Sequence, residues 1–180
     1  MGVKTTLIAG PSNLQVEKGL KIIKVKTSDE MFSAVKKNLP VDVAVCTAAV
    51  SDFKPSKFQR NKIKKKQAKE KIDLNETTDI LNYLGKNNQF RPRLVIGFSA
   101  ETEKLLQNSK SKLKAKNADW IIANDVSKKD IGFNKDYNEV TIIKSNGKIT
   151  QIKKNKKSFI ASVITEKIIN ELLIKDKSLN

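Results

Sequence analysis

The sequence predicts an α/β fold: a Rossmann-like, mostly parallel sheet with helices on both faces and an antiparallel hairpin near the C-terminus. Apolar, β-branched runs of strand length alternate with amphipathic helical segments along most of the chain. Three of the strand-like runs end in small or polar residues, which is typical of parallel strands that meet a ligand at their carboxyl ends. Near the C-terminus, Asn146-Gly147 separates two further strand-like runs and is a strong hairpin signal.

In the first half of the chain, Thr27 and Glu30 have the spacing of a capping box, so a helix is expected to begin there. Thr77 or Thr78 is expected to cap a second helix over Asp79–Gly85. Strands are expected at residues 3–9, 20–25, 41–47 and 72–74. Neither a P-loop nor a G-x-G-x-x-G fingerprint is present.

In the second half, Ser99 is expected to cap a long helix from Ala100 to about Lys116, with Glu101 near its positive end. Turns are expected at Gly132-Phe133 and at Asp136-Tyr137-Asn138. Strands are expected at residues 94–98, 120–123, 140–144 and 149–153. A last helix from about Ser158 carries one apolar stripe: Ile160, Val163, Ile164, Ile168 and Leu172.

Length and composition favour a globular chain with a sizeable core. With 180 residues, of which 38% are hydrophobic, we expect one domain over residues 1–175 and a frayed tail over 176–180. No apolar run reaches membrane-spanning length, and no signal peptide is expected. The single cysteine, Cys46, fits a reducing, cytoplasmic setting. With no histidine and one cysteine, the sequence excludes Ser-His-Asp triads, Cys-His dyads and classical zinc sites.

The formal net charge of +17 predicts a polyanionic partner such as nucleic acid, a nucleotide or a phosphorylated metabolite. Nearly all of the basic excess is lysine, whereas sites that read bases or clamp phosphates use arginine more heavily. The charge therefore favours a small anionic ligand over nucleic acid.

Small or polar clusters follow three of the expected strands, at Ala48-Ala49, Gly97-Phe98-Ser99 and Ala123-Asn124-Asp125. The carboxyl ends of parallel strands share one edge of a sheet, so these clusters are expected to meet. A lysine-rich segment around Lys62 follows the first cluster. Such a charge run is usually a solvated face, but its position after a ligand-binding strand end favours a loop that closes over phosphates.

Taken in order, these motifs resemble the bacterial phosphopantothenoylcysteine synthetase family, the phosphopantothenate–cysteine ligase of coenzyme A biosynthesis. The similarity extends from about Val3 to the C-terminal helix. The matching motifs are Ala48-Ala49-Val50-Ser51-Asp52, Lys62-Ile63-Lys64-Lys65, Thr78-Asp79-Ile80, residues 95–102 (Val95-Ile96-Gly97-Phe98-Ser99-Ala100-Glu101-Thr102), Ala123-Asn124-Asp125-Val126-Ser127, Gly132-Phe133 and Asp136-x-Asn138.

The resemblance implies that the chain ligates 4′-phosphopantothenate to cysteine with the use of CTP and Mg²⁺. The acid would first form an acyl-cytidylate, from which the amine of cysteine would displace CMP. It also implies a homodimer and an association or fusion with a flavin-dependent decarboxylase, with no membrane partner. Lys62 would be catalytic, Asn124 and Asp125 would bind the other substrates, and no metal ligand is assigned. The residues implied for CTP are Ala48, Ala49, Asp52, Lys62, Thr77, Thr78, Asp79, Ile80, Phe98, Lys112 and Lys116.

Two departures from the family pattern bear on activity. Thr78 stands where the family usually has proline, which is a minor change at a helix start. The family also begins with a further strand, a glycine-containing loop and an asparagine that acts on the acyl-cytidylate, and the first strand here corresponds to the family's second. We therefore expect the 180-residue chain to bind nucleotide but not to complete ligation.

Two other functions compete with the ligase. A basic nucleic-acid-binding module would bind arbitrary DNA or RNA with an affinity that falls steeply with salt. A dinucleotide-dependent oxidoreductase could use a similar fold, but the glycine fingerprint and a Tyr-x-x-x-Lys pair are missing from the sequence. A ligase fragment that binds nucleotide without completing catalysis is the third possibility.

Overall fold

The computed structural model describes residues 3–12, 19–57, 61, 71–87, 89–127 and 135–177. The chain divides into two compact units. Unit 1 comprises Met1–Leu39 and Ala48–Asp79, and unit 2 comprises Pro40–Thr47 and Ile80–Asn180. The chain therefore passes from one unit to the other three times, at residues 39–40, 47–48 and 79–80. The single domain expected over residues 1–175 stays a prediction.

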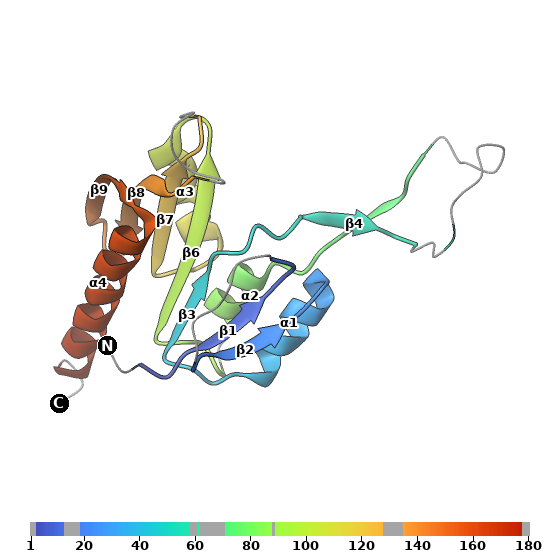
Figure 1. Cartoon of the computed structure of the whole chain (residues 1–180), viewed down its shortest axis with the longest axis horizontal. Coiled ribbons are helices and arrows are strands. Elements are labelled where there is room, and N and C mark those ends of the chain that lie inside the picture. The colour runs from blue at the N-terminus through green and yellow to red at the C-terminus, as the bar shows by residue number, and fades with distance from the viewer. Residues whose placement is uncertain are drawn as a thin grey trace. The chain divides into compact units, whose positions relative to one another are not determined.

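Unit 2 is built on a five-stranded sheet in the order β3-β6-β7-β8-β9 (Figure 1). The parallel part consists of β3 (Val43–Cys46), β6 (Leu94–Glu101) and β7 (Trp120–Asp125). An antiparallel hairpin of β8 (Tyr137–Lys144) and β9 (Ile149–Lys156) completes it. The predicted α/β fold, with its parallel strands and C-terminal hairpin, is confirmed.

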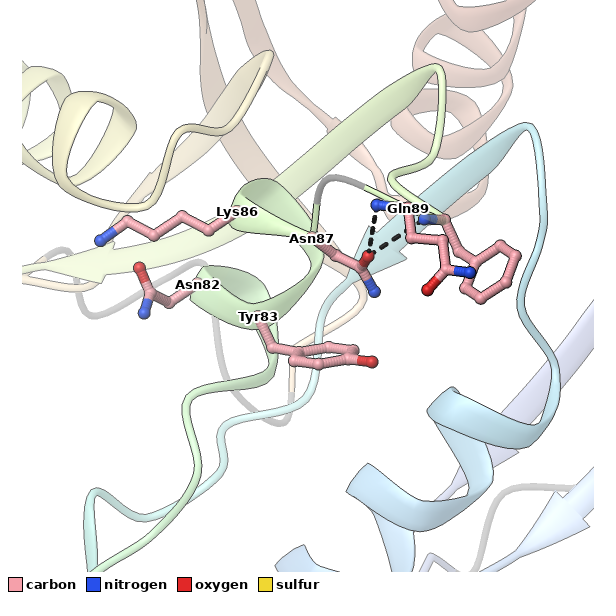
Figure 2. Close-up of a pocket in the computed structure, with 6 residues that line it drawn as sticks. Asn82, Tyr83, Lys86, Asn87 and Gln89 are labelled. Atoms are coloured by element: carbon pink, nitrogen blue, oxygen red, sulfur yellow. Dashed lines mark hydrogen bonds between the residues drawn. The ribbon is translucent and has the colours of Figure 1, made fainter.

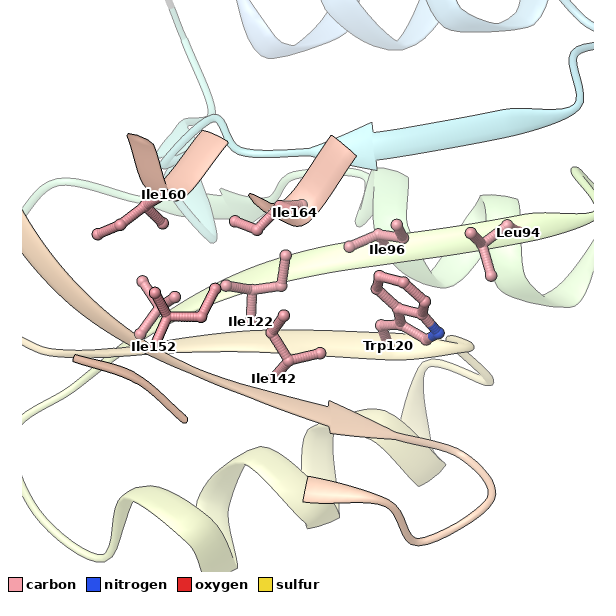
Figure 3. Close-up of a cluster of buried hydrophobic side chains, with 9 residues drawn as sticks. Leu94, Ile96, Trp120, Ile122, Ile142, Ile152, Ile160 and Ile164 are labelled. Carbon is pink, nitrogen blue, oxygen red and sulfur yellow. The ribbon is translucent and has the colours of Figure 1, made fainter. Parts of the chain in front are cut away.

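One face of this sheet packs against the long helix α4 (Lys157–Lys177). Alternate strand residues such as Ile96, Trp120 and Ile122 point to that face, and Figure 3 shows them with Ile160 and Ile164 of the helix. The whole buried cluster is Leu94, Ile96, Trp120, Ile122, Val140, Ile142, Ile152, Ile160 and Ile164. The predicted stripe of α4 is confirmed, because Val163, Ile168 and Leu172 also pack against this cluster. The helix continues to Lys177, beyond the expected end of ordered structure at residue 175.

The opposite face carries α2 (Ile80–Lys86) and α3 (Leu105–Ala115). Gly97 of β6 lies against α2, where an added Cβ would stand 2.4 Å from Cδ2 of Leu81. The glycine thus lets the helix approach the sheet closely. Among the described residues, none of the helices combines the length and the hydropathy of a membrane-spanning segment.

A polar cluster, which we call the Arg91 brace, ties the end of α2 to the loop after α3. It consists of Gly85, Arg91, Asn117 and Asp119. Nε of Arg91 and Nδ2 of Asn117 donate to the carbonyl oxygen of Gly85 at 2.9 and 2.8 Å. Nη2 of Arg91 donates to Oδ2 of Asp119 at 3.1 Å. The same carboxylate oxygen accepts the N–H of Val95 at 2.7 Å.

The helix that was expected to begin at Ala100 begins later in the structure. β6 continues to Glu101, because it pairs with β7 as far as Glu101↔Asp125, and α3 begins at Leu105. Ser99 is therefore a buried strand residue whose Oγ lies 3.2 Å from Oγ of Ser109, and it does not cap the helix. At the other end, Lys116 is the C-cap and not a helical residue. Asn117 follows with φ 49°, and the N–H of Ala118 bonds to the carbonyl of Leu113, as in a Schellman motif.

The turn expected at Asp136-Tyr137-Asn138 is wrong for its last two residues. Tyr137 and Asn138 open β8, where they pair with Lys156 and Asn155, so strand pairing overrides their turn preference. The other expected turn, Gly132-Phe133, lies outside the described residues. The Asn146-Gly147 hairpin turn is confirmed, with the N–H of Gly147 bonded to the carbonyl of Lys144 at 3.0 Å.

Unit 1 begins with the parallel pair β1 (Thr6–Ala9) and β2 (Lys21–Lys24) and the helix α1 (Ser28–Lys37). The capping box is confirmed: Oγ1 of Thr27 accepts the N–H of Glu30 at 3.2 Å, and Oε2 of Glu30 accepts the N–H of Lys26 at 2.7 Å. The second segment of unit 1 forms an antiparallel ribbon of β4 (Phe53–Pro55) and β5 (Leu74–Glu76). The sequence indicated no strand at β4, and placed β5 two residues too early.

Candidate functional site

The carboxyl ends of three parallel strands of unit 2 lie along one edge of the sheet. β3 pairs with β6 through Cys46↔Gly97, and β6 pairs with β7 through Ala100↔Asn124 and Glu101↔Asp125. Two of the three predicted clusters are therefore direct neighbours, and the third, Ala48-Ala49, follows β3 in the chain and belongs to unit 1. We call the carboxyl ends of β3, β6 and β7 in unit 2 the carboxyl edge.

Strand alternation divides the predicted site residues of unit 2 between the two faces of the sheet. Phe98 packs against the buried cluster under α4, and Asn124 lies on that face because it continues the alternation of Trp120 and Ile122. Glu101 and Asp125 belong to the other face, where α3 packs. The sequence indicated the shared edge but did not distinguish these faces.

On the α3 face, Glu101 is the centre of a polar group. Nζ of Lys112 lies 3.3 Å from Oε1 of Glu101, and Nδ2 of Asn108 donates to Oε2 at 3.2 Å. Glu101 is only 12% exposed in its side chain, compared with 38% for Lys112. Lys112, which was predicted to meet a triphosphate, is thus held at the carboxyl edge with its charge partly balanced.

Asp125, at the end of β7, turns its carboxylate towards its own loop. Its Oδ1 accepts the N–H of Ser127 at 3.0 Å and the hydroxyl of the same residue at 2.6 Å. Such a turn fixes the direction in which the chain leaves the strand. Asn124 is oriented by a different partner, Asn138, whose Nδ2 donates to Oδ1 of Asn124 at 2.9 Å. No role was predicted for Asn138 from the sequence, although it belongs to one of the matching motifs.

Most of the other residues predicted to bind nucleotide belong to unit 1. Hydrogen bonds bring the two ends of the ribbon together: Oγ1 of Thr77 donates to the carbonyl of Ser51, and the N–H of Thr77 bonds to the carbonyl of Asp52 at 2.9 Å. The residues of unit 1 that were predicted to bind nucleotide have exposed or half-buried side chains. They are Ala48, Ala49, Asp52, Thr77, Thr78 and Asp79. Ile80 opens α2 with a buried side chain, and Lys62 lies outside the described residues.

Two open pockets in unit 2 lie apart from the predicted site residues. One, of about 420 Å³, follows the end of α2 (Figure 2), and its lining consists of Asn82, Tyr83, Lys86, Asn87, Gln89 and Phe90. The other, of about 350 Å³, surrounds the ion pair of Lys144 and Glu171, whose Nζ and Oε2 are 2.6 Å apart. Neither pocket is lined by a residue that was predicted to belong to the functional site. In the part of the chain that the structure describes, no three Cys, Asp or Glu side chains converge as metal ligands.

The fold and the carboxyl edge define a Rossmann-like α/β domain whose polar residues gather where parallel strands end. The family model described as "DNA/pantothenate metabolism flavoprotein C-terminal domain" matches residues 1–172, and the chain belongs to this family.

Two curated relatives show how the chain relates to longer proteins. The Coenzyme A biosynthesis bifunctional protein CoaBC of Borreliella burgdorferi is 38% identical over 167 residues, which cover 91% of this chain and 41% of the relative. A cysteine/cysteine sulfinic acid decarboxylase of an unknown prokaryotic organism is 34% identical over 171 residues, covering 94% and 47% respectively. The chain thus spans less than half the length of these relatives.

Two solved structures share the fold. The crystal structure of the C-terminal domain of a Coenzyme A biosynthesis bifunctional protein CoaBC has a TM-score of 0.74 and 30% identity, and the match covers 96% of this chain and 76% of that one. A Cab2 mutant in complex with phosphopantothenate-cysteine has a TM-score of 0.62 and 17% identity, covering 89% and 56% respectively. At that identity the second likeness shows the fold alone.

Proposed function

We propose that this chain is a phosphopantothenate–cysteine ligase domain, which joins the carboxylate of 4′-phosphopantothenate to the amine of cysteine in coenzyme A biosynthesis. The family match over residues 1–172 is the observation that carries the proposal. The identity of 38% to a CoaBC protein supports it. At the carboxyl edge, Glu101 and Lys112 on one face of the sheet and Asn124 on the other provide charged and hydrogen-bonding groups where α/β sheets bind ligands.

CTP would activate the acid. The carboxylate attacks the α-phosphate, pyrophosphate leaves, and the amine of cysteine then displaces CMP from the acyl-cytidylate. The residues that the family resemblance implies for CTP are proposed to hold the nucleotide, with Phe98 beside it and Lys62 acting at the α-phosphate. Transfer of this kind depends mainly on positioning and on cations that offset the developing negative charge, so lysines suffice as the main charged groups.

Mg²⁺ would accompany the nucleotide. The described residues do not form a three-ligand cluster of their own, so they do not fit a dedicated protein site for the ion. Mg²⁺ commonly takes most of its ligands from substrate phosphates and water. The ligation of Mg²⁺ is therefore assigned to the triphosphate and to water.

Calorimetric titration with CTP and Mg²⁺ tests the nucleotide part of the proposal. We expect saturable binding that exceeds ATP binding and that weakens at least about tenfold in Lys62→Ala, because a lysine at the phosphates contributes a charge-assisted hydrogen bond. Lys57→Ala, from the same basic segment, is the matched control and should bind normally. Equal binding of CTP and ATP would contradict the CTP assignment, and salt-sensitive binding of arbitrary DNA in place of CTP would favour the nucleic-acid alternative.

Lys112 offers a separate test within the described structure. Lys112→Ala should weaken CTP binding several-fold, since its ammonium group lies at the carboxyl edge beside Glu101. Lys110→Ala removes the same charge from an exposed position of α3 and serves as the control. Titration of both variants at 50 and 200 mM salt measures the difference. Equal losses in the two variants would indicate a general charge effect and would remove Lys112 from the site.

The remaining parts of the proposal concern partners. A homodimer is proposed from the family resemblance, and light scattering of the purified chain measures it. A functional association with a flavin-dependent decarboxylase is proposed from the same resemblance and agrees with the bifunctional name of the relative.

A further inference from the structure

Two asparagine side chains at the carboxyl edge form a short chain of hydrogen bonds, which we call the amide relay. The N–H of Glu139 donates to Oδ1 of Asn138 at 3.0 Å. Nδ2 of Asn138 then donates to Oδ1 of Asn124 at 2.9 Å. Asn138 and Asn124 are both half-buried, so these bonds are partly shielded from competing water.

The polarity of this relay is fixed by its first member. A backbone N–H can only donate, so the amide oxygen of Asn138 must face Glu139 and its nitrogen must face Asn124. That nitrogen needs an acceptor, so Asn124 presents its oxygen to Asn138. The amide nitrogen of Asn124 is therefore turned away from Asn138, and among the described residues it has no acceptor.

The position of Asn124 indicates what its free donors could meet. It lies near the carboxyl end of β7, paired with Ala100 and on the same face as Phe98. An amide NH₂ group that is half-buried and fixed in orientation is suited to an acceptor oxygen, and it would be poorly suited to another donor.

We propose that Asn138 is a positioning residue, which holds the amide of Asn124 so that its N–H groups bind an oxygen acceptor of the acid substrate, a carboxylate or an amide carbonyl. This inference rests on the proposed ligase function. The inference adds to that function a residue, Asn138, that determines whether the acid's binding site presents hydrogen-bond donors or acceptors. Asn138 itself does not touch the substrate.

Asn138→Asp is the decisive variant because it is nearly isosteric and reverses the relay. A carboxylate at position 138 still accepts the N–H of Glu139, but it has no N–H to offer to Asn124. Asn124 must then turn its nitrogen towards the carboxylate and present its oxygen to the ligand. We expect the Kd for 4′-phosphopantothenate to rise about tenfold or more, with the Kd for CTP changed less than twofold. Asn124→Asp should show the same selective loss.

Asn155→Asp is the matched control. Asn155 lies on β9 opposite Asn138, and its Oδ1 accepts the N–H of Lys156 at 2.8 Å, which reproduces the first bond of the relay without a link to Asn124. Calorimetry should show normal binding of both ligands by this variant. A second readout is the side-chain ¹⁵N–¹H signal of Asn124, identified by its absence in Asn124→Asp, which should shift when 4′-phosphopantothenate is added to the unmodified chain.

The outcomes separate the two proposals. If the unmodified chain binds 4′-phosphopantothenate and Asn138→Asp binds it equally well, the relay is overturned and the ligase function stands. The relay would also be overturned if Asn155→Asp lost as much affinity for 4′-phosphopantothenate as Asn138→Asp, or if Asn138→Asp lost as much affinity for CTP as for the acid. Either result would indicate a structural role, because a structural defect does not affect one ligand selectively. If the unmodified chain does not bind the acid at all, the proposed function itself fails.

Discussion

Replacing Gly85 by alanine should destabilise unit 2 by about 3 kcal/mol or more, since overpacking against rigid atoms is among the costliest single changes. An added Cβ would stand 2.0 Å from the carbonyl oxygen of Lys116 and 2.8 Å from that of Asn117. Both are backbone atoms of a well-defined helix end, so they cannot rotate aside as a side chain could. Relief would require α2 to separate from the loop after α3, which would break the hydrogen bonds of the Arg91 brace.

Urea unfolding followed by tryptophan fluorescence measures this effect in unit 2. The chain has one tryptophan, Trp120, which is 1% exposed in the core of that unit. Gly97→Ala and Gly147→Ala are graded comparisons. An added Cβ at Gly97 meets the end of the flexible Leu81 side chain. An added Cβ at Gly147 meets no atom within 4 Å, but the backbone there has φ +86°, which strains an alanine. The order of destabilisation should be Gly85, Gly97, Gly147, with about 1 kcal/mol for the last. A Gly85→Ala protein as stable as the Gly147→Ala protein would contradict the close approach.

Asp119→Ala should cost about 3 kcal/mol of the free energy of unfolding. The side chain accepts hydrogen bonds from Arg91 and from the N–H of Val95, and Val95 is fully buried. Removing the carboxylate leaves that backbone N–H without its side-chain acceptor and leaves a half-buried guanidinium without its counter-charge. Asp119→Asn keeps one acceptor oxygen but replaces the other with an NH₂ donor and removes the charge, so it should cost roughly half as much as Asp119→Ala.

The same fluorescence measurement applies, with Asp136→Ala as control. Asp136 is exposed in unit 2, and its backbone carbonyl, which the substitution retains, accepts the N–H of Lys157. The control should lie within about 0.5 kcal/mol of the unmodified chain. Because Gly85 and Asp119 share the brace, the double variant should lose less than the sum of the two single losses. Strict additivity would indicate that the two residues act independently.

The sequence was informative where local pattern and packing agree. The stripe of α4, the apolar runs of β6 and β7 and the Asn146-Gly147 turn each have one physical reading, and all three formed as predicted. It failed where pairing with a distant strand decided the outcome. Ser99 and Glu101 have the composition of a helix start, but β7 extends far enough to keep them in β6. Tyr137 and Asn138 have turn composition, but β9 pairs with them.

The candidate site was predictable in its position and not in its internal contacts. That strand ends share an edge follows from parallel pairing alone. Which face each residue occupies depends on register, and the pairing of Glu101 with Lys112 depends on where α3 begins. The role of Asn138 could not be inferred from its position in the chain, because its effect is exerted through Asn124, fourteen residues earlier.

The order of strands in unit 2 also bears on how the chain is made. From β6 onward each strand pairs with the next one in the sequence, but β3 must wait for β6, whose partner residues follow about 50 positions later. At ribosomal rates of about 5–20 residues per second, β3 emerges several seconds before its partner. During that interval its VAVC segment is a nascent strand with unpaired backbone groups. β3 therefore stays without its partner for longer than any other strand of this sheet, and it is the point at which a nascent chain would first need protection by a chaperone.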